Sequence, residues 1–117
     1  MVEYQATLDR TFTALGDATR RAILSRLARG PMTVTAVAVP FAMSLAAVSK
    51  HLRTLEAAGL VRREVRGREH HLSLEAAPLR EAARWTERYR AFWEARMDAL
   101  DAYLRERKPR ERKRGPR

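Results

Sequence analysis

The stretch from Ser44 to Gly59 constrains this chain most, because it reads as one amphipathic helix with a small, basic outer face. It opens on Ser44, a residue type that caps helices, and closes on Gly59, which readily ends a helix in the left-handed region. Val48, Leu52 and Leu55 recur at spacings of four and three residues, so they share one face that should be buried. The opposite face is small, polar and cationic, and it consists of Ala46, Ser49, Lys50, Arg53 and Thr54. A helix with an apolar back and a short basic front suits an anionic surface, and we interpret it as a DNA recognition helix.

The residues before this stretch predict three further helices. The first is indicated by apolar side chains at spacings of four, four and three residues, at Tyr4, Leu8, Phe12 and Leu15. The second follows Asp17, whose carboxylate can accept hydrogen bonds from the free amides of a helix start, and it ends at Gly30-Pro31. Thr33 can cap a short third helix, whose expected buried residues are Val34, Val37 and Phe41. Only two residues separate that helix from Ser44, and two helices joined by so short a turn form a helix-turn-helix pattern.

A β-hairpin is expected directly after the recognition helix. Residues 60–66 and 69–74 are strand-like segments, and Arg66-Gly67-Arg68 lies between them as a turn. A hairpin in this place is a wing, with Arg66 and Arg68 at its tip. Arginine suits phosphate through its planar fork and a narrow minor groove through its charge, so both side chains are expected to contact DNA.

A long helix is predicted from Ala77 to about Arg107, which is roughly 45 Å at 1.5 Å per residue. Its apolar residues follow a spacing close to a heptad repeat, and four aromatic residues fall within nine positions. A domain this small cannot cover the whole stripe, so we interpret it as a homodimer interface. The expected interface residues on this helix are Trp85, Tyr89, Phe92, Trp93, Met97 and Leu100. The alternative is that the stripe packs entirely within one chain.

The net charge of the 117-residue chain is +10, from 24 basic and 14 acidic residues. Such an excess favours a polyanionic partner, most often nucleic acid, although a merely soluble basic protein is the alternative. Residues 108–117 are strongly basic and contain no large apolar side chain, so they are expected to form a disordered tail after a single domain of residues 1–107. This tail could either follow DNA phosphates or only add solubility.

Enzymatic and metal-binding chemistry is not indicated. The chain has no cysteine, which excludes disulfides and thiolate metal sites and makes a reducing cytoplasm the simplest setting. His70 and His71 are neighbours on a predicted strand, so their side chains leave opposite faces and cannot bind one ion together. No segment is apolar enough to span a membrane, and residues 1–10 do not read as a signal peptide. We therefore expect a cytoplasmic protein that is not an enzyme and carries no cofactor or metal.

With these motifs in place, the chain resembles the ArsR-type winged helix-turn-helix transcriptional regulators. Leu15 to Leu24 resembles the opening signature of that family, although Ala18 stands where proline is common. Ser44 to Leu52 and Leu55 to Val61 resemble its recognition helix and the entry to its wing, and the resemblance covers residues 4–105. It implies a mainly α (α+β) fold, a winged helix-turn-helix with a two-stranded β-wing and a long C-terminal dimerisation helix. It also implies a homodimer, formed through the first and last helices with Leu8 and Phe12 at the interface, that binds a palindromic operator and represses transcription.

The chain departs from the metal-sensing members of that family. Those members place cysteines in the third helix, where this chain has Val34 to Val39, and can place histidine ligands on the terminal helix, which has none here. The chain is similar instead to a metal-independent branch that shares Met43-Ser44-Leu45 and an aromatic terminal helix. We therefore expect no metal-sensing site. Whether a small-molecule or protein inducer acts on the chain is left open.

The double-stranded DNA contacts expected on the recognition helix are Ser44, Leu45, Ala46, Ser49, Lys50, His51 and Arg53, joined by Arg66 and Arg68 of the wing. Ser44 and the amides beside it should meet a phosphate, and the two residues that follow should touch bases. His51 is included because it lies on this helix, although packing or a polar surface is the commoner setting for such a histidine. A winged helix that binds another protein and does not read DNA is the alternative from a different class, and RNA binding is a third.

Overall fold

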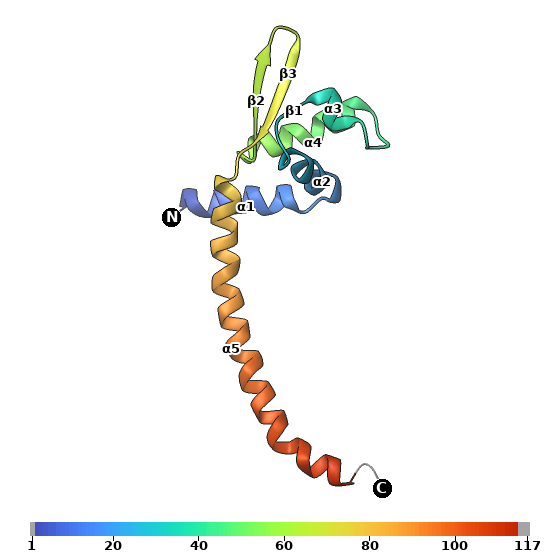
Figure 1. The fold of residues 1–117 in the computed structure, drawn as a ribbon. Coiled ribbons are helices and arrows are strands. Elements are labelled where there is room, and N and C mark those ends of the chain that lie inside the picture. Colours follow the sequence, from blue (N-terminus) through green and yellow to red (C-terminus); the bar gives the residue numbers. More distant parts are fainter. Residues whose placement is uncertain (1, 115–117) are drawn as a thin grey trace. The chain divides into compact units, whose positions relative to one another are not determined.

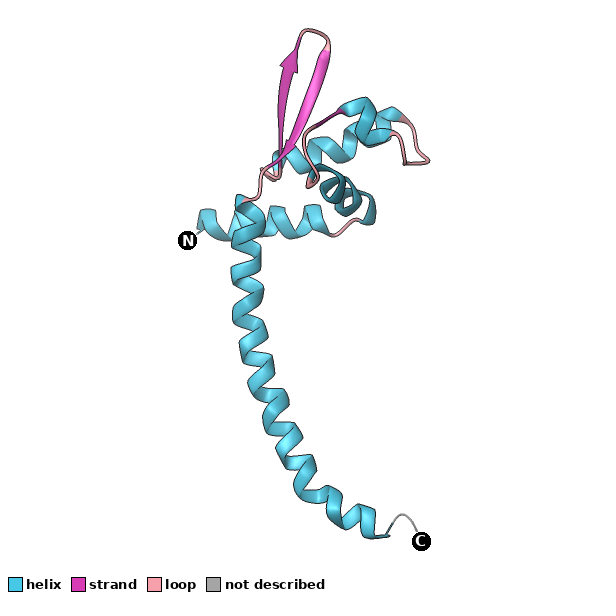
Figure 2. Ribbon diagram, viewed as in Figure 1, coloured by secondary structure: helices cyan, strands magenta, loops and turns pink. Residues whose placement is uncertain are grey.

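The structure is a computed structural model that describes the backbone of residues 2–114 and the side chains of residues 3–107. Its helices and strands are, in chain order, α1 (Val2–Leu15), α2 (Ala18–Leu27), β1 (Met32–Thr33), α3 (Val34–Ala38), α4 (Leu45–Ala57), β2 (Val61–Arg66), β3 (Glu69–Leu74) and α5 (Ala77–Arg114). The chain divides into two compact units, Met1–Ala82 and Ala83–Arg117. The first is a helical body with a small antiparallel sheet, and the second is the rest of α5 (Figure 1, Figure 2). The expected mainly helical winged fold is confirmed.

Side chains cap three helices of the first unit as their residue types predict. Asp17, Thr33 and Ser44 each accept a hydrogen bond from the amide three residues further on, at 3.0, 3.2 and 3.1 Å. Each bond satisfies one of the amides that a helix start leaves without a partner inside the helix. After α4 the chain turns at Gly59, whose φ of 76° is the left-handed geometry that glycine tolerates best.

The core of the first unit is formed by apolar side chains from α2, α3, α4 and the hairpin. The largest side chains that are fully buried in it are Ile23, Val37, Val48, Leu52, Leu55, Leu60 and Leu72. The predicted back of the recognition helix is therefore confirmed, because Val48, Leu52 and Leu55 are all 0% exposed. This burial fixes which face of α4 is turned outward.

The sheet has the strand order β1-β3-β2 and is antiparallel throughout. Strands β2 and β3 form the expected hairpin, closed by Gly67 with a φ of 64° and by Arg68, whose φ is not positive. A left-handed residue only at the first central position matches a type II′ turn, in which glycine is preferred there. The expected two-stranded wing gains a third strand, because Met32 and Thr33 pair with Leu72 and His71. A strand of two residues is too short to show an alternating pattern in the sequence.

Helix α5 continues to Arg114, beyond the expected end at about Arg107. Six of the seven added residues are arginine, lysine or glutamate, which have high helix propensity, while the seventh, Pro109, removes one amide donor. Residues 115–117 of the expected tail, and the side chains of residues 108–114, lie outside the described residues, so the tail stays a prediction. In the described part of the chain, no helix is long and apolar enough to cross a membrane.

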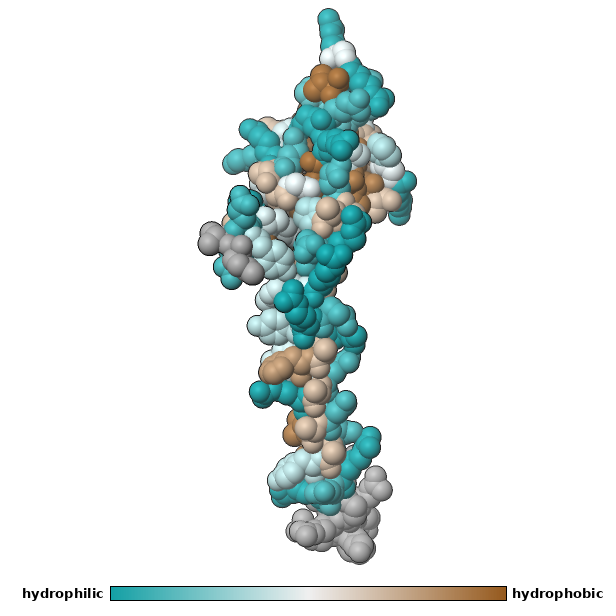
Figure 3. All heavy atoms as spheres, turned by 90° about the vertical axis from the view of Figure 1, so that its left-hand side faces the viewer, coloured by the Kyte–Doolittle hydropathy of each residue, from teal (hydrophilic) through white to brown (hydrophobic). Residues whose placement is uncertain are grey.

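The residues expected at a homodimer interface differ in how much surface they leave for a partner. On α5, Tyr89, Phe92, Trp93, Met97 and Leu100 are each about half exposed, and Figure 3 shows apolar side chains gathered along this helix. On α1, Leu8 is only 6% exposed, so most of its surface is already covered within its own protomer. Leu8 therefore has little surface to offer a partner, whereas Phe12 is partly exposed.

Candidate nucleic-acid interface

The outer face of α4 carries most of the expected DNA contacts. Ser44, Leu45, Ala46, Lys50 and Arg53 are exposed, and Ser49 is partly exposed. They lie together because the buried leucines and valine hold the opposite face of the helix against the core. Leu45 is 52% exposed, which is a large apolar surface to leave in water near the start of a helix. Such a surface suits the methyl group of a thymine in the major groove.

The start of α4 also suits an anion. Ser44 uses its hydroxyl oxygen to cap the helix, so its O–H remains able to donate to another acceptor. The first amides of the helix lie at the positive end of its dipole, where a phosphate is favoured. The arrangement therefore offers an anion-binding end followed by two cationic side chains, Lys50 and Arg53, about one turn apart.

His51 does not lie with the other candidates. Its Nδ1 is 3.2 Å from Nη1 of Arg20 and 3.8 Å from a carboxylate oxygen of Asp17, both near the start of α2. The same guanidinium donates to the carbonyls of Ala14 and Thr13 at 2.8 and 3.1 Å. The expectation that His51 faces DNA is therefore corrected, because the ring packs towards α2. The sequence position of His51 already indicated this, because it lies three residues after the buried Val48 and four before the buried Leu55.

The wing tip carries the two expected arginines. Arg66 forms an ion pair with Glu64 at 3.1 Å, and Arg68 occupies the second central position of the turn. Both side chains are exposed. The charge of Arg66 is partly offset by Glu64 in the free protein, so a phosphate would compete with that carboxylate.

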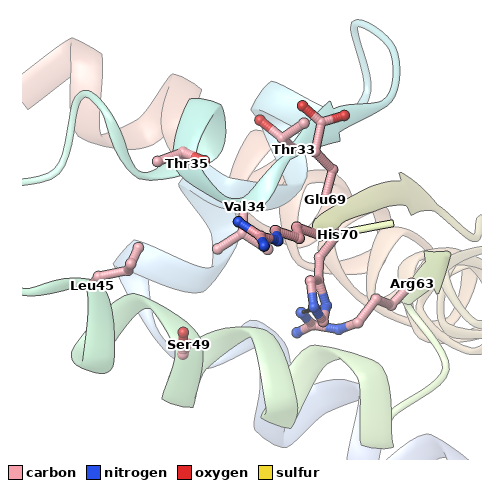
Figure 4. A pocket seen from close by; sticks show the side chains of 9 residues that line it. Thr33, Val34, Thr35, Leu45, Ser49, Arg63, Glu69 and His70 are labelled. Atoms are coloured by element: carbon pink, nitrogen blue, oxygen red, sulfur yellow. Dashed lines mark hydrogen bonds between the residues drawn. The ribbon is translucent and has the colours of Figure 1, made fainter. Parts of the chain in front are cut away.

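A cleft of about 410 Å³ separates the recognition helix from the wing (Figure 4). Leu45 and Ser49 face it from α4, while Arg63 and His70 meet on the wing side. The cleft is lined by Thr33, Val34, Thr35, Leu45, Ser49, Arg63, Arg68, Glu69 and His70. Several of these residues were not predicted to belong to the site, because only the fold brings the start of α3 beside the wing.

Arg63, on strand β2, was not among the residues predicted to contact DNA, but it joins the wing to α4. Its Nε and Nη2 donate to the two carboxylate oxygens of Glu56 at 3.2 and 2.6 Å. Its Nη1 lies 3.0 Å from Nδ1 of His70 on the neighbouring strand. The hydrogen bonds to Glu56 raise the pKa of the Arg63 guanidinium above its usual value. These contacts tie the wing to the last turn of α4, near Glu56.

The histidines are separated as their sequence positions suggest. His70 contacts Arg63, whereas His71 lies 3.1 Å from a carboxylate oxygen of Glu69. Among the described residues, no group of three or more histidine, aspartate or glutamate side chains is placed to hold a metal ion.

Comparisons with known proteins place this surface in context. A helix-turn-helix domain family matches residues 15–64. The HTH-type transcriptional regulator Rv2034 of Mycobacterium tuberculosis is 51% identical over 53 residues, which are 45% of this chain and 50% of that protein. The chain thus spans only half the length of that relative. The transcriptional repressor SdpR of Bacillus subtilis is 32% identical over 78 residues, covering 67% of this chain and 87% of that protein.

Solved structures give the same result. An ArsR family transcriptional regulator is 39% identical, with a TM-score of 0.73 over 77% of this chain and 93% of that chain. An ArsR-like transcriptional regulator from Rhodococcus sp. RHA1 is 36% identical, with a TM-score of 0.68 over 85% and 93% of the two chains. The homodimeric winged helix-turn-helix DNA-binding domain Mb0332 from Mycobacterium bovis shares the fold at 24% identity and a TM-score of 0.60, over 84% and 88%. All these relatives are described as regulators of transcription or as DNA-binding domains, which are non-enzymatic classes.

Proposed function

The chain belongs to the ArsR family of DNA-binding winged helix-turn-helix transcriptional regulators, and we propose that it is a homodimeric repressor that binds a palindromic operator without sensing a metal. The observation that carries the proposal is the outer face of α4, where the exposed Lys50 and Arg53 follow a capped helix start. This face is exposed and basic, which suits the base edges and phosphates of a major groove.

Each protomer lays α4 into a major groove. Ser44 and the first amides of the helix bind a phosphate and fix the register, while Leu45 and Ala46 touch bases. Ser49, Lys50 and Arg53 reach base edges or phosphates further along the groove. Arg66 and Arg68 of the wing contact the backbone or the adjacent minor groove. Because few of these groups make directed hydrogen bonds to bases, much of the specificity comes from the two cations and from DNA shape.

Two protomers pair through the apolar stripe of α5. The half-exposed aromatic and aliphatic side chains on that helix favour a partner surface, and a second copy offers an identical stripe. The homodimeric description of Mb0332 supports the same assembly. A two-fold dimer presents two recognition helices to half-sites about 34 Å apart, which requires an inverted repeat in the DNA.

Repression is the regulatory outcome that we propose, because SdpR, which is similar to this chain over 67% of its length, is a transcriptional repressor. An operator that overlaps a promoter would exclude the polymerase. Metal-independent binding is proposed because the chain has no cysteine and its histidines are committed to separate contacts. A small-molecule or protein inducer is compatible with this proposal.

The test is to select duplexes from a random DNA library with the purified protein and to sequence the bound pool. The expected product is an inverted repeat with half-site centres one helical turn apart, bound equally well with and without a chelator. Placed over a promoter, that repeat should lower transcription of a reporter when the protein is expressed. A bound pool without symmetry would contradict the dimeric reading of DNA, and raised transcription would contradict repression.

A further inference from the structure

With the wing tip in the adjacent minor groove, the proposed function brings a DNA strand across the cleft between α4 and the wing, and this inference rests on that function. A helix in the major groove and a wing tip in the adjacent minor groove are separated by one sugar-phosphate strand. The space between the helix and the wing is the cleft of about 410 Å³. We propose that His70 binds a phosphate of that strand as a neutral N–H donor, held in one tautomer by Arg63.

The contact between Arg63 and His70 determines where the imidazole carries its proton. Nη1 of Arg63 lies 3.0 Å from Nδ1 of His70. A guanidinium has only donors, so Nδ1 of His70 must be the acceptor and carry no proton. The neutral ring then carries its hydrogen on Nε2, which makes Nε2–H the donor that the side chain offers.

Arg63 is a positioning residue in this arrangement, because each of its three nitrogens already makes a contact within the protein. Its Nε and Nη2 bind both oxygens of Glu56 on α4, and the two side chains are 24% and 27% exposed. The carboxylate offsets the charge of the guanidinium, so Arg63 adds little direct attraction for a phosphate. Arg63 therefore affects the affinity for DNA indirectly, because it fixes the orientation and the tautomer of His70.

The other side chains that line the cleft include donors that suit a DNA phosphate. Arg68 supplies a cation, and Ser49 and Thr35 supply hydroxyl donors. Glu69 also lines the cleft, but its carboxylate lies 3.1 Å from Nε2 of His71. Apart from the Arg63–Glu56 and Glu69–His71 pairs, the lining thus offers one cationic donor and several neutral ones. Such groups bind the DNA backbone and fix position without reading sequence.

The first experiment measures operator affinity against salt concentration for the wild type and three variants, at about pH 8.5, where histidine side chains are ordinarily neutral. His70→Ala should weaken binding about tenfold, as expected for a lost hydrogen bond to a charged acceptor. Its slope of log affinity against log salt should equal that of the wild type, because a neutral donor displaces no counterion. Arg68→Ala should lower the slope by about 0.9.

His71→Gln is the matched control, since this residue lies on the opposite face of the same strand and glutamine can keep a hydrogen bond to Glu69, so affinity and slope should both stay unchanged. Unchanged binding by His70→Ala would overturn the proposal. A slope reduced as far as that of Arg68→Ala would also overturn it, because His70 would then bind as a cation. A wild-type chain that binds no DNA would contradict the proposed function itself, so the two failures are distinguishable.

The second experiment reads the tautomer in the free protein by NMR of ¹⁵N-labelled histidine, with the ring signals assigned through His→Gln variants. His70 should show an unprotonated Nδ1 and a protonated Nε2 in the wild type. Arg63→Met should give a mixture of tautomers and lose as much operator affinity as His70→Ala, with little further loss in the double variant. A proton on Nδ1 of His70 in the wild type would refute the role of Arg63, whether or not the Arg63 variant folds.

Discussion

At the scale of single residues, Asp17 combines a capping and an electrostatic role. Its carboxylate accepts a hydrogen bond from the amide of Arg20 at 3.0 Å and lies 3.8 Å from Nδ1 of His51. The amide bond is the largest of the effects that lower the pKa of Asp17 below its usual value. A pKa lowered by folding means that the ionised carboxylate stabilises the folded state.

This linkage predicts a particular dependence of stability on pH. The contribution of Asp17 is fully present above the unfolded pKa, near 3.9, and is lost as the pH falls through the lower folded pKa. Asp17→Asn keeps a good capping residue but removes the charge. In urea titrations the wild type should therefore be more stable than the variant at about pH 6, and the difference should shrink below about pH 4. A difference that does not vary with pH would contradict the electrostatic role.

At the scale of elements, the wing places two cations at the end of a hairpin, and their charges should appear in the salt dependence of binding. Replacing Arg66 and Arg68 together by alanine should lower the slope of log affinity against log salt by up to about 1.8, because each phosphate contact releases about 0.9 counterions. The control is Arg62→Ala at the base of the wing, where the arginine pairs with Glu75 at 3.2 Å. A slope that the double variant leaves unchanged would mean that the wing does not contact DNA.

The elements also show what the sequence could predict. The recognition helix, its caps and the hairpin were predictable, because each depends on local spacing or on one residue type at one position. Strand β1 was not, since two residues carry no period. The bond between Arg63 and Glu56 and the turn of His51 towards Arg20 depend on how distant elements pack, which spacing alone does not reveal.

At the scale of the whole molecule, binding to an inverted repeat requires two copies joined through α5. Trp93→Asp places a charge in the middle of the apolar stripe, where pairing would bury it, so the variant should sediment as a monomer. Ala91→Asp is the matched control, because it adds the same charge close to the opposite side of the helix and should remain a dimer. If Trp93→Asp also remained a dimer, the stripe would not be the interface.

Recognition of an operator by the outer face of α4 underlies the whole proposed function, and a single affinity measurement decides it. Lys50→Ala combined with Arg53→Ala should weaken binding to the selected operator by about 100-fold or more at fixed salt, because each contact is worth about 1–3 kcal/mol. Thermal unfolding should be unchanged, since both side chains are exposed. Arg10→Ala combined with Arg29→Ala is the matched control. Both arginines are exposed and lie outside this face, so this variant removes the same charge and should lose far less affinity. A folded Lys50 and Arg53 double variant that binds the operator as tightly as the wild type would contradict the account.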